Sequence, residues 1–141
     1  MAALPGQPAR PRALQALQGN YQYLAVLHCE LREPAAAVRC AEDSLRTGNP
    51  DAVAVLFASR IPVACMGLIE KDEELPAEER GQAVESLARR AIELVCVAVA
   101  QGFHNVAELK SSQNFNAIRG RAGFQEIVRE LERKASSAPA R

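Results

Sequence analysis

The two histidines of the chain, His28 and His104, carry the side chains best suited to proton transfer near neutral pH or to binding a metal ion. Neither has an acidic residue or a cysteine at the spacing that a metal site or a catalytic pair uses. His28 falls on the apolar stripe of an expected helix, and His104 follows the expected end of another. We therefore expect both histidines to pack against or cap helices, and neither predicts catalysis.

Four cysteines could bind zinc, exchange disulfides or act as nucleophiles, but they lie far apart in the sequence. None has another at the paired spacing of zinc sites or redox motifs. The even number would permit two disulfides, yet each cysteine falls inside an apolar helical pattern, where a free thiol behaves as a small buried hydrophobe. We expect reduced, structural thiols, and no metal or other cofactor, at Cys29, Cys40, Cys65 and Cys96.

An acidic run could offer oxygen ligands to calcium. It consists of Glu70, Asp72, Glu73 and Glu74. The run lacks the alternating ligands and the mid-loop glycine of known calcium loops, so we expect a solvated loop.

Two arginines, Arg119 and Arg121, flank Gly120 near an expected helix start, where a phosphate group could bind. We favour a structural role, in which one guanidinium group holds carbonyls of the preceding polar connection or of a helix end. The serines of the polar segments have no histidine base, and the glycines do not form a nucleotide-binding loop. The sequence therefore predicts a protein that is not an enzyme.

Length and composition favour a single all-α domain. The chain has 141 residues, enough for one core, and its 17 basic and 17 acidic residues give no net charge. Because no overall field draws the protein to nucleic acid or to anionic lipid, we expect neither as a partner. Aromatic residues make up 4% and tryptophan is absent, while alanine and straight-chain residues that favour helices dominate.

The N-terminal segment has no apolar region typical of a signal peptide. The continuous apolar run from Ala91 to Ala100 is too short to span a bilayer. We therefore expect a cytoplasmic protein without membrane contacts.

Three helices are predicted in the first half of the chain. Residues 1–12 are proline-rich and are expected to form a disordered tail before a helix over residues 13–31. A second helix starts at Pro34, and a third is capped by Asn49 and carries Pro62, which should kink or break it. The expected buried stripes are Leu14, Leu17, Tyr21, Leu24, His28 and Leu31 on the first helix, and Val53, Leu56, Phe57, Ile61, Ala64 and Leu68 on the third.

A fourth helix is predicted from about residue 76 to residue 100, followed by Gly102 in the left-handed conformation and by Phe103 folding back on the last turn. A short helix over residues 106–110 and a final amphipathic helix with Phe124, Ile127, Val128 and Leu131 come next. Residues 135–141 are expected to be a disordered tail. The inner stripe of the fourth helix comprises Val84, Leu87, Ala88, Ala91, Leu94, Val95 and Ala98, and Ile92, Cys96 and Val99 widen it so that contacts on two sides are implied.

The two helix pairs share a weak internal similarity with a spacing near 34 residues, typical of a helical repeat. Residues at tetratricopeptide spacing are Leu24, Ala25 and His28 on one helix and Ala37, Ala41 and Ser44 on the next, with Pro50 near the end of the unit. Their small side chains let paired helices approach closely. We expect a helical repeat domain over residues 13–134, a short α-solenoid of antiparallel, tetratricopeptide-like pairs with a C-terminal capping helix.

The region from Arg90 to Glu132 resembles the tetratricopeptide-type tail that follows the kinase domain in many planctomycete serine/threonine protein kinases. The matching positions are Gly102, Phe103, Leu109, Phe115, Ile118, Arg119, Arg121 and Phe124. The kinase motifs themselves are missing, since the chain has no glycine-rich loop, no catalytic HRD and no DFG. The resemblance implies a bacterial, kinase-associated, non-catalytic tail, either free-standing or part of a larger protein.

We therefore expect a scaffold that binds a protein or peptide in a groove lined by the first helix of each pair. The candidate binding residues are Asn20, Tyr21, Tyr23, His28 and Arg60. One alternative is a regulatory or remnant C-terminal segment of a serine/threonine protein kinase. Another is a homo-oligomer, because two repeats leave an apolar end uncovered.

Overall fold

The computed structural model describes residues 9–137, which form helices joined by short turns. The α-helices are α1 (Ala9–Glu30), α2 (Pro34–Leu45), α3 (Ala52–Glu70), α4 (Ala77–Ala100), α5 (Val106–Ser111) and α6 (Ala122–Ser137), and η1 (Gln113–Phe115) is a 3₁₀ helix. The prediction of an all-α fold is confirmed for these residues.

The helical domain is longer than predicted at both ends. Residues 9–12 already belong to α1, because Pro11 falls in the first turn, where its missing N–H costs no intrahelical hydrogen bond. Residues 135–137 continue α6, and the Ser137 hydroxyl donates to the Lys134 carbonyl over 3.1 Å. The rest of the two predicted tails, residues 1–8 and 138–141, lies outside the described residues.

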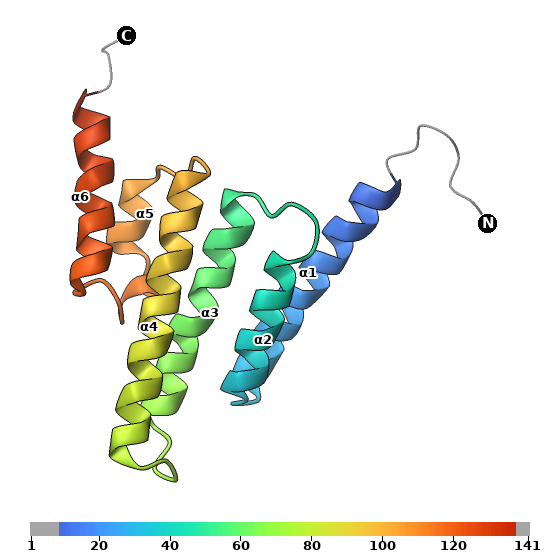
Figure 1. Cartoon of the computed structure of the whole chain (residues 1–141), viewed down its shortest axis with the longest axis vertical. Helices are drawn as coiled ribbons and strands as arrows, with labels where there is room; N and C mark the ends of the chain where they lie inside the picture. Colours follow the sequence, from blue (N-terminus) through green and yellow to red (C-terminus); the bar gives the residue numbers. More distant parts are fainter. Residues whose placement is uncertain (1–8, 138–141) are drawn as a thin grey trace.

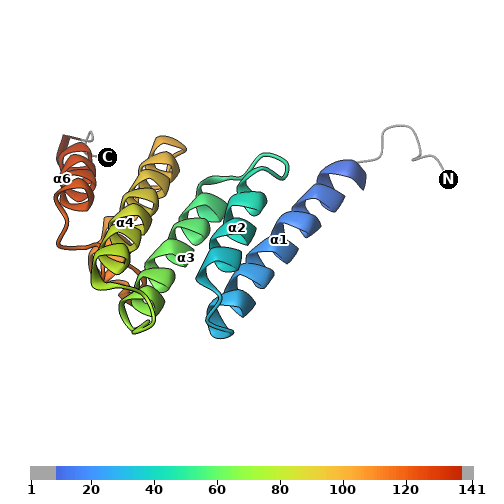
Figure 2. The same cartoon turned by 60° about the horizontal axis from the view of Figure 1, so that its bottom comes forward.

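Consecutive helices run antiparallel and lie side by side in a row (Figures 1 and 2). α1 packs on α2, α2 on α3, and α3 on α4. α3 also contacts α1 and η1, so it lies at the centre of the packing. α6 contacts α4 and α5 at one end of the row, and α1 lies at the other end (Figure 2).

Small buried side chains let α1, α2 and α3 pack closely. Ala25, Ala37 and Ala58 are completely buried. Ser44 and Ser59 are buried too, and each hydroxyl donates to a carbonyl of its own helix, so that neither hydroxyl is left unpaired.

The predicted buried stripe of α1 is wrong in part. Leu17, Leu24 and Leu31 are 43%, 41% and 65% exposed, whereas the completely buried residue of this helix is Ala25. On a helical projection Ala25 lies about 100° from Leu24, so the covered face is turned away from the predicted one. Within the described residues, no helix covers the outer side of α1.

The predicted stripe and start of α3 are also corrected. Val53 is 71% exposed and Ala64 is exposed, because α3 turns other residues toward its neighbours. The helix is capped by Asp51 rather than by Asn49, and the Asp51 carboxylate accepts from the Ala54 amide over 2.8 Å. α3 continues without a break through Pro62, which is buried between neighbouring helices.

The prediction for α4 is confirmed along most of its length. All residues of the predicted inner stripe are buried except Leu87, which is half-buried. Gly102 has a φ of 111°, and the Phe103 amide donates to the Ala98 carbonyl over 3.0 Å, which closes the helix end as expected. Cys96, expected to be buried, is exposed.

Candidate interaction surface

The helix α1 combines exposed apolar side chains with an absence of charge. Between Ala13 and Cys29 it has no Asp, Glu, Lys or Arg, although 24% of the whole chain is charged. Tyr23 is 65% exposed and Val26 is 36% exposed, in addition to the exposed leucines. Depletion of charge together with exposed aromatic and aliphatic groups is typical of the centre of protein–protein interfaces. This makes α1 the candidate interaction surface.

Three of the five predicted binding residues lie in the middle of α1. Asn20 and Tyr23 are exposed, and Tyr21 is half-buried. On the helical projection Tyr21 and Tyr23 lie about 160° apart, so they do not form one face. The structure therefore leaves Asn20 and Tyr23 accessible and turns Tyr21 toward the packed side of the helix.

His28, near the end of α1, is half-buried and has an acidic neighbour that the sequence did not reveal. Its Nδ1 lies 3.4 Å from Glu33 Oε2 without the geometry of a hydrogen bond. Glu33 directly precedes α2, so this contact joins the two ends of the turn between the helices.

Arg60, the fifth predicted binding residue, is occupied by a contact within the fold. Its guanidinium donates to the Glu108 carboxylate over 2.9 Å, which ties α3 to α5. Its Nε is buried and makes no hydrogen bond within the described residues. The structure does not bring Arg60 together with the exposed residues of α1.

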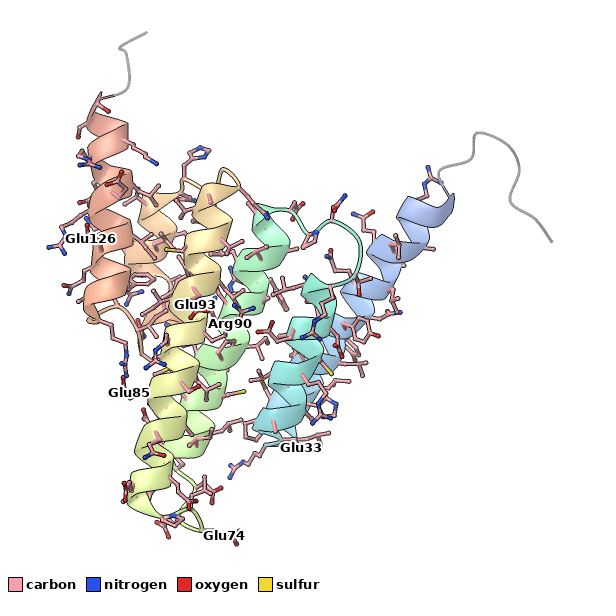
Figure 3. The ribbon with its side chains drawn as sticks, in the orientation of Figure 1. Glu33, Glu74, Glu85, Arg90, Glu93 and Glu126 are labelled. Atoms are coloured by element: carbon pink, nitrogen blue, oxygen red, sulfur yellow. The ribbon has the colours of Figure 1, made fainter. Side chains whose placement is uncertain are left out.

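A second ion pair joins the two helices α2 and α4. Arg90 donates to both carboxylate oxygens of Glu42, over 2.6 and 2.7 Å, and also to Glu93 over 3.2 Å. In Figure 3 the Arg90 side chain extends from α4 toward α2. These charge-assisted hydrogen bonds raise the pKa of Arg90, against the opposing effect of partial burial.

A cleft of about 660 Å³ between α4 and the start of α6 was missed in the sequence. It exposes Cys96 and Val97, and Arg121 at its edge donates to the Glu85 carboxylate over 2.9 Å. The feature of the sequence that indicated contacts on this side of α4 was its unusually wide apolar stripe. Ile92, which belongs to that stripe, lies against Gly123 at the start of α6.

Arg119 holds the C-terminal region together, which agrees with the predicted structural role of one of the two arginines. Its guanidinium donates to the carbonyls of Leu109 and Ser112 and to the side-chain oxygen of Asn116. Around it, four apolar side chains are completely buried, namely Leu109, Phe115, Ile118 and Phe124. Arg119 therefore stabilises the connection between α5 and α6.

The side chains of two cysteines, Cys29 on α1 and Cys65 on α3, lie close enough to influence each other's ionisation. This proximity lowers the pKa of Cys29, and it raises the pKa of Cys65, which burial raises further. The Cys65 thiol also donates to the Pro34 carbonyl over 3.6 Å. The two cysteines therefore connect the ends of α1, α2 and α3.

Comparisons with protein-family models, with curated proteins and with solved structures found no match. The function must therefore be inferred from the chain itself. Among residues 9–137, no three His, Cys, Asp or Glu side chains come together in a way that could hold a metal ion.

Among the described residues one helix, α3, is long and apolar enough by length and composition to cross a membrane. Its most apolar window is 56% buried within the fold, where it contacts α1, α2 and α4. Core helices of soluble proteins meet the same criterion, so the feature is weak support for a membrane span.

Proposed function

We propose that this protein is a non-catalytic scaffold that binds a protein or peptide through exposed apolar residues of its first helices. The observation that carries the proposal is the uncharged surface of α1, on which Tyr23 and Val26 remain exposed. A helix surface of this composition offers few groups that hydrogen-bond to water. Binding of a partner removes its apolar area from solvent, which is favourable.

The order of packing supports a tetratricopeptide-like arrangement as the framework of this scaffold. Each helix packs on the next from α1 to α4, and the first helices of the two pairs, α1 and α3, contact each other. The small residues expected at tetratricopeptide spacing are buried between the helices, as Ala25, Ala37 and Ser44 illustrate. In such an array the first helices of the pairs line one common surface, on which a peptide can lie.

The proposed binding surface comprises Tyr23 and Val26 of α1 together with Val53 of α3, which is 71% exposed. Tyr21 lies on the packed side of α1, about 160° from Tyr23, so we assign it no contact with the ligand. Arg60 would contribute only if it released Glu108, so we do not assign it a binding role.

The proposal can be tested by affinity capture from the native cell, followed by binding measurements with the captured partner. The double variant Tyr23→Ala/Val26→Asp should weaken binding at least tenfold. The matched control is Val97→Asp, because Val97 has a similar exposure of 42% but lies on α4. Equal binding by the double variant and the control would exclude the α1 surface as the binding site.

A second candidate function is the regulatory tail of a serine/threonine protein kinase. Four of the residues that resemble planctomycete kinase tails are completely buried, namely Leu109, Phe115, Ile118 and Phe124. Phe115 and Phe124 pack with ring centroids 5.7 Å apart, and Arg119 holds the polar connection. Sequencing of the transcript tests this function. A kinase reading frame continuous with this chain would support it, and a separate start codon with no kinase in frame would contradict it.

A further inference from the structure

The exposed leucines of α1 and the leucine that directly follows it belong to a regular heptad pattern, which also includes half-buried Leu27. Leu17, Asn20, Leu24, Leu27 and Leu31 follow one another at alternating steps of three and four residues, and we call this set the α1 seam. Leu31 continues the helical geometry, since its amide donates to the Leu27 carbonyl over 2.9 Å. A stripe with this spacing is the pattern by which two helices pack along their length with a left-handed twist.

Three leucines of the α1 seam are substantially exposed among the described residues, whereas Leu27 is half-buried. Leu17 and Leu24 are more than two-fifths exposed, and Leu31 is nearly two-thirds exposed. The residues that α1 uses for packing inside the fold, such as Ala25 and Gln18, lie on a different side of the helix. The seam therefore remains available when the fold is complete.

The opposite end of the row has a very different outer surface. There, α6 carries exposed ion pairs between Arg129 and Glu126 and between Arg133 and Glu130. A surface of alternating charges is well solvated and needs no partner. This contrast indicates that a partner binds at the α1 end of the row of helices and not at the α6 end.

We propose that the α1 seam binds the α1 seam of a second copy of this protein, forming a symmetric dimer. A heptad stripe is complementary to an identical stripe, so one surface serves both subunits. The uncharged stretch from Ala13 to Cys29 places no like charges against each other, and the chain has no net charge that would repel a second copy.

Charges at the two ends of this stretch favour an antiparallel pair. Arg12 lies before it and Glu30 after it, about five helical turns apart and on the same side of α1. An antiparallel arrangement brings Arg12 of each subunit near Glu30 of the other, whereas a parallel arrangement places like charges together. In the antiparallel pair Leu17 faces Leu27 and Asn20 faces Leu24.

The dimer does not depend on the proposed peptide-binding surface, because Tyr23 and Val26 project beside the α1 seam rather than within it. Two helices of this length bury an area near the lower limit of specific interfaces, roughly 1,200 Å² in total, so we expect a dimer that dissociates on dilution. Asn20 lowers the affinity because a polar group is buried against an apolar one.

Sedimentation equilibrium of the full chain over a range from about 1 μM to 500 μM tests the dimer. The variant Leu17→Lys/Leu24→Lys should raise the dissociation constant at least tenfold, and Asn20→Leu should lower it several-fold. Val97→Lys is the matched control, since Val97 is 42% exposed on another helix, and it should leave the constant unchanged. Circular dichroism melts at low concentration verify that each variant is folded.

Charge exchange tests the orientation. Arg12→Glu should weaken the dimer, and Arg12→Glu/Glu30→Arg should restore it at low salt, because an antiparallel pair regains its opposite charges. Failure of the double variant to restore the dimer would refute the antiparallel arrangement. If the wild-type protein is a monomer at every concentration, the dimer is refuted. The α1 seam would then bind a helix of a different protein. The capture experiment with Tyr23→Ala/Val26→Asp is independent of both results.

Discussion

Replacement of Ala91 by leucine should destabilise the domain measurably. Ala91 is completely buried at the centre of the stripe with which α4 packs on α3. A leucine adds three carbon atoms where the helices already touch, and such overpacking costs about 1–3 kcal/mol in the free energy of unfolding. For a domain of this size, each kcal/mol lowers the melting temperature by roughly 4 °C, so the expected decrease is about 4–12 °C.

The assay is thermal and urea unfolding followed by circular dichroism, with Ala100→Leu as the matched control. Ala100 lies at the end of the same helix and is exposed, so the same substitution there should change the melting temperature by less than about 2 °C. If Ala91→Leu melts at the wild-type temperature, α4 does not contact α3 through this residue and the described packing is incorrect.

Further predictions concern a hydrogen-bonded side chain, a helix cap and the thiols. Arg119→Ala should lower the free energy of unfolding by about 1–3 kcal/mol in urea titrations, because two backbone carbonyls lose a charged donor, and lysine should restore only part of it. Asp51→Ala should cost about 1 kcal/mol, whereas Asp51→Asn should be nearly neutral because asparagine also caps α3. In pulse alkylation followed by mass spectrometry, exposed Cys96 should react before buried Cys65. Since the pKa of Cys29 is lowered, its alkylation should begin at a lower pH than that of an ordinary thiol of equal exposure, because the thiolate is the reacting form.

The helices that could be predicted in detail from the sequence are those with one polar and one apolar side. α4 and α6 keep charged residues away from their buried stripes, so that the period of the pattern identifies the packed face, as for Val84 and Phe124. The end of α4 was predictable because Gly102 adopts a backbone conformation that other residues avoid.

The packed faces of α1 and α3 could not be predicted, for two opposite reasons. α3 is surrounded by neighbours and is apolar nearly all round, so no period distinguishes exposed Val53 from buried Val55. α1 is uncharged through its middle, and its apolar residues divide between the fold and the outer seam, so that Leu24 and Ala25 look equivalent in the sequence. The contact between Arg60 and Glu108 depends on where α5 returns to α3, which no local pattern records.

The central position of α3 also determines how the domain should open. Amide hydrogens exchange slowly where many contacts must break together, so α3 and the facing side of α4 should be the most protected. In the N-terminal half of α1, Gln18 donates to the carbonyls of Ser44 and Thr47 over 3.2 and 3.3 Å, and most other described side chains are exposed. Exchange should therefore proceed from this end inward, and a dimer would slow it there as the protein concentration rises.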